Sequence, residues 1–170
     1  MRILIITQYF WPENFRINDL VQALSGRGHQ ITILTGEPNY PSGKFFPEYI
    51  FDKSKFNNFQ GSQVLRVPVF ARKNNRFSLF LSYLSYIISA STIGVWKLRS
   101  KPFDVIFVYE PSPITVGLPA ALFKKIKKAP IAFWVLDLWP HTLQAVGILK
   151  SQFLLKLIGK IVNSQTLLER

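Results

Sequence analysis

The chain opens with apolar and polar segments in the order expected of a strand, a helix and a second strand. The first apolar run covers positions 2–7, a helical pattern covers positions 14–27 and closes at Gly28, and a second apolar run covers positions 30–35. Two apolar runs joined by a helical pattern predict parallel strands. We therefore expect a ligand crevice where the carboxyl ends of those strands meet.

The same alternation continues along the rest of the chain. Apolar runs that predict strands lie at positions 63–70, 103–109 and 130–136. Helical patterns lie at positions 77–96 and 113–125 and in two stretches after Pro140. This order predicts an α/β fold: a Rossmann-like, mostly parallel sheet with helices on both faces, in one domain spanning residues 1–170.

Two segments refine this outline. Pro68 should limit the strand predicted at positions 63–70, because proline cannot donate a hydrogen bond to a neighbouring strand. Positions 37–60 are rich in aromatic residues, Pro and Asn, and they are predicted to form one long loop. A loop of that length in a compact domain is usually functional.

The charge of the chain is strongly basic and unevenly distributed. There are 21 Lys and Arg against 9 Asp and Glu, a formal net charge of +12. Positions 53–101 hold nine basic residues and no acidic one, and positions 124–128 add four lysines. Such a field attracts nucleic acid, anionic lipid or phosphorylated substrates, and net charge alone does not choose among them.

The uncharged segment at positions 77–96 bears on that choice. Its length alone would allow it to span a membrane, but Ser78, Ser82, Ser85 and Ser89 recur at helical spacing and share one face. That face favours a helix packed on the sheet. A helix lying on an anionic membrane surface and a spanning helix remain alternatives.

Polar, proline-marked loops follow four of the predicted strands. Glu13, Glu110 and Asp137 lie in these loops. Each could cap a helix, but their joint placement at one edge of the sheet favours a ligand site. Asn14 and Arg16 lie at a helix start, where backbone N–H groups favour a phosphate, although Arg16 could also be an exposed first-turn residue.

Metal and disulfide chemistry find little support in the sequence. The chain has no cysteine, and it lacks both a pair of histidines at metal-ligand spacing and an Asp-x-Asp motif. We expect no bound metal and no cofactor. The amino terminus lacks a small-residue cleavage site and carries polar residues soon after its apolar run, so we expect no signal peptide. We expect a cytoplasmic location.

Several separated motifs resemble those of a known enzyme family. They are Trp11-Pro-Glu-Asn-Phe-Arg-Ile-Asn-Asp19, Gly26-Arg-Gly-His29, Leu34-Thr-Gly-Glu-Pro-Asn-Tyr-Pro-Ser-Gly43, Asp104-Val-Ile-Phe-Val-Tyr-Glu-Pro-Ser-Pro113 and Asp137-Leu-Trp-Pro140. Together they resemble the N-terminal half of a family 4 glycosyltransferase. Within that family, the chain is similar to the WbuB/WcaI-like enzymes of surface-polysaccharide and O-antigen synthesis.

The resemblance implies an architecture and a reaction. Family members are retaining GT-B enzymes in which two Rossmann-like domains face each other across a cleft and no metal is bound. The N-terminal domain mostly holds the acceptor, and the C-terminal domain, which is absent from this chain, holds the nucleotide-sugar. This fragment alone should therefore be inactive.

The resemblance, with the loop placement, also implies roles for individual residues. The catalytic candidates are Asp137, Glu110 and Glu13, and the candidates for the donor diphosphate side are Asn14 and Arg16. The acceptor-binding candidates are Tyr40, Phe45, Phe46, Tyr109 and His141, although His141 could be a plain helix-start residue. This chain departs from the family at Pro12-Glu13-Asn14, where a Gly-Gly pair is common, and at Asp137, where a His is frequent.

The implied acceptor is a polyprenyl-diphosphate-linked sugar, which would place the domain peripherally on the inner face of the plasma membrane. The candidates for contact with anionic lipid are the basic residues beside the uncharged segment and in the lysine block, namely Arg72, Lys73, Arg76, Lys124, Lys125, Lys127 and Lys128.

Two other function classes were weighed against this one. A nucleic-acid-binding module would explain the charge, but the chain has no RNA-recognition or helix-turn-helix signature, and its aromatic residues lie mostly in apolar runs. The other is a non-catalytic adaptor that docks a separately encoded donor-binding subunit of a split transferase. We expect no nucleic acid partner.

Overall fold

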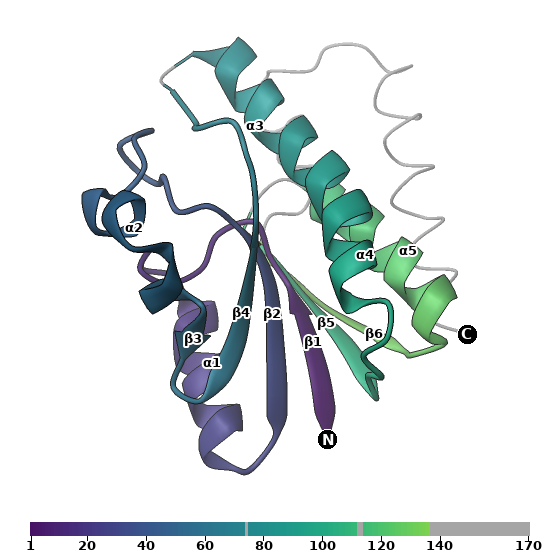
Figure 1. Ribbon diagram of the computed structural model, residues 1–170. Helices are drawn as coiled ribbons and strands as arrows, with labels where there is room; N and C mark the ends of the chain where they lie inside the picture. The colour runs from purple at the N-terminus through teal and green to yellow at the C-terminus, as the bar shows by residue number, and fades with distance from the viewer. Residues whose placement is uncertain (74, 112–113, 137–170) are drawn as a thin grey trace, which may run out of the picture.

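The computed structural model of the chain describes residues 1–73, 75–111 and 114–136 (Figure 1). Its strands are β1 (Arg2–Ile6), β2 (Gln30–Gly36), β3 (Asn58–Phe59), β4 (Ser62–Val67), β5 (Val105–Glu110) and β6 (Ile131–Val135). Its helices are α1 (Arg16–Gly26), α2 (Pro47–Phe51), η1 (Lys53–Phe56), α3 (Arg76–Ser89), η2 (Ala90–Gly94), α4 (Val95–Leu98), η3 (Ile114–Val116) and α5 (Gly117–Lys127).

The strands form one six-stranded sheet in the order β3-β4-β2-β1-β5-β6. All neighbours are parallel except the short β3, which pairs antiparallel with β4. The central strand β1 pairs on one side with β2, at Ile5 and Ile33, and on the other with β5, at Ile5 and Phe107. The strands that follow β1 along the chain are added first on one side of it, as β2 and β4, and then on the other side, as β5 and β6. Parallel α/β sheets commonly bind ligands at such a topological switch point, which here lies between β1 and β5.

Helices cover both faces of the sheet (Figure 1). The side chains of α1 pack on one face, where Ile17 and Val21 meet Ile3, Ile5 and other strand residues. The helices α3, α4 and α5 lie on the other face and enclose a second core with Leu4, Ile6 and Leu34. The predicted Rossmann-like fold class is therefore confirmed.

Most predicted elements appear with small shifts at their ends. The strand predicted at positions 63–70 ends at Val67, directly before Pro68, as expected. The helix predicted at positions 113–125 begins as η3 and continues as α5 to Lys127. Ser112 and Pro113, the predicted start of that helix, lie outside the described residues, as do the helical stretches predicted after Pro140.

The prediction of one long loop at positions 37–60 was wrong, because this segment contains α2, η1 and β3. Pro47 begins α2 at a position where its missing N–H costs nothing. Asp52 then caps η1 by accepting a hydrogen bond from the Ser54 N–H. Short polar caps therefore divide a segment whose composition alone suggested irregular structure.

The uncharged segment forms a continuous helical rod, α3 followed by π-helical η2 and α4. Its serine face points inward, as the spacing predicted: Ser82 is fully buried and its hydroxyl accepts a hydrogen bond from Gln8. The Ser85 hydroxyl accepts from the Phe70 N–H. Gly94 faces Leu34 so closely that a Cβ there would lie 2.9 Å from a Leu34 methyl carbon.

The opposite face of this rod is apolar and exposed. Phe77 is 70% exposed, Phe80 59%, Ile88 54% and Trp96 62%. By length and composition the rod Arg76–Leu98 could cross a membrane. Its most apolar 18 residues have a mean hydropathy of 1.4, and 22% of them are buried. Because its inner face is hydrogen-bonded to the sheet layer, this structure holds it on the sheet with an apolar stripe facing outward.

Candidate functional site

The candidate site is the edge of the sheet where the parallel strands end. Three loops meet there: residues 7–15 after β1, residues 37–46 after β2 and residues 68–73 after β4. Hydrogen bonds connect the loops, for example from the Asn39 N–H to the Glu13 carboxylate and from the Arg72 N–H to the Asn39 side-chain oxygen. The predicted convergence of the loops after β1 and β2 is thus present in the structure.

Glu13 joins two of these loops. Its carboxylate accepts hydrogen bonds from the backbone N–H groups of Phe10 (3.1 Å), Asn39 (2.8 Å) and Tyr40 (2.7 Å), and the residue is 3% exposed. Burial raises the pKa of this carboxyl to about 7, while the three N–H donors and Arg66 oppose the rise. The geometry gives Glu13 a structural role in shaping the loops, and its catalytic role stays a prediction.

Arg66, near the end of β4, is a second connection that the sequence analysis did not identify. Its guanidinium donates hydrogen bonds to the Gly36 carbonyl at 3.0 Å and to the Trp11 carbonyl. It also lies 5.5 Å from the centre of the Tyr49 ring. Burial lowers the pKa of Arg66 to about 10, so the group remains charged at neutral pH and binds carbonyls of both neighbouring loops.

An aromatic cluster lies beside these connections. Tyr9 stacks on Phe15 with ring centres 5.4 Å apart, and Tyr40 lies 5.5 Å from Tyr9 and 5.3 Å from Phe15. The guanidinium of Arg72 lies 5.5 Å from the centre of the Tyr40 ring. Tyr40, predicted to bind the acceptor, is therefore part of a cationic and aromatic group whose other members were not predicted as acceptor ligands.

Arg16, Tyr109 and Glu110 lie near the switch point between β1 and β5. Arg16 is the exposed first residue of α1, and Glu110 is the fully buried last residue of β5. Burial raises the pKa of Tyr109, while the nearby backbone and guanidinium of Arg16 oppose the rise. The structure thus brings the predicted phosphate ligand Arg16 next to Tyr109.

The remaining predicted site residues are more dispersed. Asn14 is exposed, Phe45 is partly buried against the core under α3, and Phe46 precedes α2. The ring of Tyr109 packs edge-on against Trp134 at 5.2 Å within the core, so its surface is largely taken up by protein. Asp137 and His141 lie outside the described residues, and their roles stay predictions.

The predicted lipid-binding residues differ in their surroundings. Lys73, Arg76, Lys125 and Lys128 are exposed, whereas Arg72 and Lys124 are half-buried. The Lys127 ammonium donates to the carbonyl oxygens of Leu98 and Arg99, both at 2.6 Å, at the end of α4. Lys127 therefore has a structural contact that competes with the predicted lipid contact.

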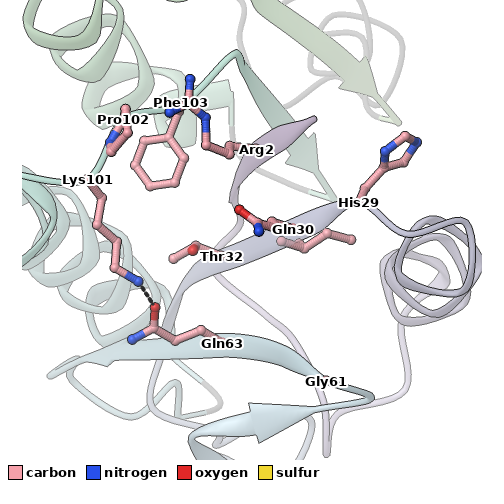
Figure 2. A pocket seen from close by; sticks show the side chains of 10 residues that line it. Arg2, His29, Gln30, Thr32, Gly61, Gln63, Lys101, Pro102 and Phe103 are labelled. Carbon is pink, nitrogen blue, oxygen red and sulfur yellow. Dashed lines mark hydrogen bonds between the residues drawn. The ribbon is translucent and has the colours of Figure 1, made fainter.

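Two cavities open on the surface, one of them beside Arg66. One of about 500 Å³ lies over the amino ends of β1, β2 and β4, where Arg2, Gln30, Thr32 and Gln63 face an uncovered part of the sheet and Lys101 donates to Gln63 (Figure 2). The other, of about 370 Å³, runs along β4. Neither lies where the loops after β1 and β5 meet.

A metal site in a protein needs several ligating side chains close together. Within residues 1–73, 75–111 and 114–136, no group of three or more His, Cys, Asp or Glu side chains could hold a metal ion. The expected independence from metal stays a prediction.

Comparison with known proteins identifies similar folds. No family model and no curated protein matches the chain. Among solved structures, it is similar to the glycosyltransferase of kitacinnamycin (12% identity, TM-score 0.56, 86% of this chain, 34% of that chain). It is also similar to the calicheamicin glycosyltransferase (14% identity, TM-score 0.57, 96% of this chain, 42% of that chain).

A third similar structure carries a different function in its name. It is the C-terminal domain of a hydrogenase from Pyrococcus furiosus (16% identity, TM-score 0.52, 78% of this chain, 90% of that chain). At these identities the similarity concerns the fold alone. The chain spans well under half the length of either glycosyltransferase, and it has the Rossmann-like α/β fold that a part of each of them also has.

Proposed function

We propose that the chain is the acceptor-side domain of a GT-B glycosyltransferase, which transfers a sugar from a nucleotide-sugar to a lipid-linked glycan. The observation that carries the proposal is the set of connected loops at the carboxyl edge of the sheet, with Arg16, Tyr109 and Glu110 at the switch point. The fold shared with parts of two glycosyltransferases supports it. The family resemblance of the loop motifs supports the narrower assignment to retaining, family 4-like enzymes of surface-polysaccharide synthesis.

The proposed chemistry requires groups that stabilise the leaving diphosphate and groups that act on the sugar and the acceptor. Breaking the bond between a sugar and a nucleoside diphosphate develops negative charge on the leaving diphosphate. Arg16 and the amide groups at the start of α1 are suited to stabilise that charge, with Asn14 beside them. A carboxylate is suited to orient the acceptor hydroxyl or to stabilise the reacting sugar carbon. Glu110 and Asp137 are the proposed carboxylates.

In a transfer assay, we expect the chain alone to bind a polyprenyl-diphosphate-linked acceptor but to form no product with any of a panel of nucleotide-sugars. In the proposed architecture the donor-binding domain is not among these residues. Acceptor binding is measured by calorimetry and product by mass spectrometry, with a two-domain glycosyltransferase as the positive control. Turnover comparable to that control would contradict the assignment to one half of the enzyme, and absence of acceptor binding would contradict the assignment to the acceptor side.

We further propose that the domain docks on anionic membrane through the outer face of α3 to α4. This face presents Phe77, Phe80, Ile88 and Trp96 to solvent. Exposed basic residues lie at both ends, Lys73 and Arg76 before it and Lys97 and Arg99 after it. An exposed apolar stripe with basic ends matches the chemistry of an interfacial helix. A cytoplasmic, peripheral location follows from this docking.

Vesicles of anionic lipid should pellet the wild-type chain at low salt and release it at high salt, because the Debye length falls from about 10 Å at 0.1 M to about 3 Å at 1 M. The double change Lys73→Glu and Arg76→Glu should weaken binding at least roughly tenfold, since each basic residue near the surface contributes about 1 kcal/mol. Phe77→Ser with Phe80→Ser should also weaken it. Phe51→Ser, at a residue that is 90% exposed on α2, is the matched control and should have no effect. Binding that resists high salt would contradict peripheral docking.

A further inference from the structure

We propose that Arg72 and Tyr9 form a subsite for the diphosphate of the lipid-linked acceptor. This inference rests on the proposed function and adds to it the residues that recognise the acceptor. It assigns Arg72 to a specific anion site, whereas Lys73 and Arg76 remain general contacts with the membrane surface. The two residues come from different loops, after β4 and after β1.

The Tyr9 hydroxyl provides the first observation. Tyr9 is 3% exposed, and its hydroxyl makes no hydrogen bond of good geometry in the described part of the chain, although the Arg72 side chain lies beside it. Its ring contacts those of Phe15 and Tyr40, which also contact each other. A buried hydroxyl without a partner costs free energy, about 1–3 kcal/mol in proteins, and a ligand oxygen at this position would remove that cost.

Arg72 provides the second observation. Its backbone N–H donates to the side-chain oxygen of the buried Asn39 at 2.9 Å, and its guanidinium lies over the Tyr40 ring. Gly43 packs directly on the Arg72 carbonyl group. Within residues 1–73, 75–111 and 114–136, Arg72 forms no ion pair with an acidic side chain. The positive charge of Arg72 is therefore held between the Tyr9 hydroxyl and the Tyr40 ring without a neutralising carboxylate among the described residues.

The side chains of Arg72 and Tyr9 lie close together, and both contact the Tyr40 ring. Burial raises the pKa of Tyr9, and the Arg72 guanidinium lies close enough to oppose that rise. A planar guanidinium binds phosphate oxygens bidentately, and a phenol hydroxyl can donate a further hydrogen bond to the same group. The pair therefore matches the chemistry of a phosphate or diphosphate better than that of a neutral sugar.

The position of the pair favours the acceptor over the donor. Arg72 lies just before α3, at the end where the exposed apolar stripe begins with Phe77. A diphosphate bound here would have its polyprenyl chain next to the membrane-facing helix. Arg16, the proposed ligand of the donor diphosphate, begins α1, which covers the opposite face of the sheet (Figure 1).

The test measures binding of inorganic diphosphate and of farnesyl diphosphate to the chain by calorimetry. Tyr9→Phe should weaken both about tenfold, and its melting temperature should stay the same or rise, because the change removes only a hydroxyl that lacks a partner. Arg72→Ala should weaken both roughly 10- to 100-fold, and Arg72→Lys should be intermediate, since it keeps the charge but loses the bidentate geometry.

Tyr86→Phe is the matched control for loss of a buried tyrosine hydroxyl. Tyr86 is 1% exposed and its hydroxyl donates to the Leu34 carbonyl, so this variant should lose stability and keep its affinity for diphosphate. Equal affinity of Tyr9→Phe and wild type for both diphosphates would overturn the proposal. So would binding that depends on Arg16 and is indifferent to Arg72.

Vesicles of phosphatidylglycerol separate the two possible sources of phosphate. Loss of vesicle binding in Tyr9→Phe with unchanged diphosphate affinity would assign the pair to bilayer headgroups and overturn the acceptor assignment. Because these are binding measurements, they can fail while sugar transfer by the complete enzyme stands. Diphosphate binding can equally be observed where no sugar is transferred. The binding measurements therefore test the Arg72 and Tyr9 subsite, whereas the transfer assay tests the proposed function.

Discussion

Replacing Glu13 by alanine is expected to destabilise the fold by roughly 3–5 kcal/mol, the cost of breaking a buried charged network. The change would leave the N–H groups of Phe10, Asn39 and Tyr40 without their acceptor in a buried position. A typical domain has about 5–15 kcal/mol of total stability, so the variant should unfold at much lower urea concentration or fail to fold. Urea denaturation followed by tryptophan fluorescence measures this effect.

Glu48→Ala is the control for loss of a glutamate without such contacts, because Glu48 is exposed in the first turn of α2. Its cost should stay within about 1 kcal/mol, the scale of an interaction with the helix dipole. A loss of less than about 1 kcal/mol for Glu13→Ala would contradict the structural role given to this carboxylate.

The pH dependence of Glu13→Gln gives a second readout of the same group. The folded pKa of Glu13 is raised to about 7, whereas an unfolded glutamate has a pKa of about 4.3. The folded state therefore holds the proton more tightly, and this contribution to stability is complete below about pH 4 and is lost as the pH rises through about 7. Between about pH 5 and about pH 8, the advantage of wild type over Glu13→Gln should fall by up to about 3 kcal/mol. An advantage that grows over this range would contradict the raised pKa.

Gly43→Ala is expected to separate the loop after β2 from the loop after β4. Gly43 has φ +68°, and an added Cβ would lie 2.9 Å from the Arg72 carbonyl carbon and closer still to its oxygen. The left-handed conformation costs a residue with a Cβ about 1–2 kcal/mol, and the backbone overlap adds about 1–3 kcal/mol. Because Arg72 would have to move, affinity for diphosphate should fall together with the melting temperature.

Gly28→Ala is the control that separates the cost of the left-handed backbone conformation from the cost of overlap with Arg72. Gly28 also has a positive φ, +80°, but a Cβ there would meet nothing within 4 Å. This control should show only the conformational cost of about 1–2 kcal/mol and keep its diphosphate affinity. Equal stability and equal affinity of the two alanine variants would show that the approach of Gly43 to Arg72 is unimportant.

Local sequence patterns predicted the main elements of this fold. Continuous apolar runs such as positions 103–109 predicted buried parallel strands, and β5 (Val105–Glu110) begins two positions after that run and ends one position after it. Pro68 marked the end of β4, and the serine spacing identified the inner face of α3. These signals are local, because strand length, proline chemistry and helical periodicity depend on residues close together along the chain.

The contacts of the loop residues, in contrast, depend on segments far apart in the sequence. Nothing near Glu13 in the sequence indicates that its carboxylate accepts from Asn39 and Tyr40, and Arg66 binds carbonyls of loops that precede it by 30 and 55 positions. The pairing of Tyr9 with Arg72 likewise joins the ends of two strands. A carboxylate, a phenol or a guanidinium can bind many groups, and which one it binds depends on what the folded sheet brings within about 3 Å of it.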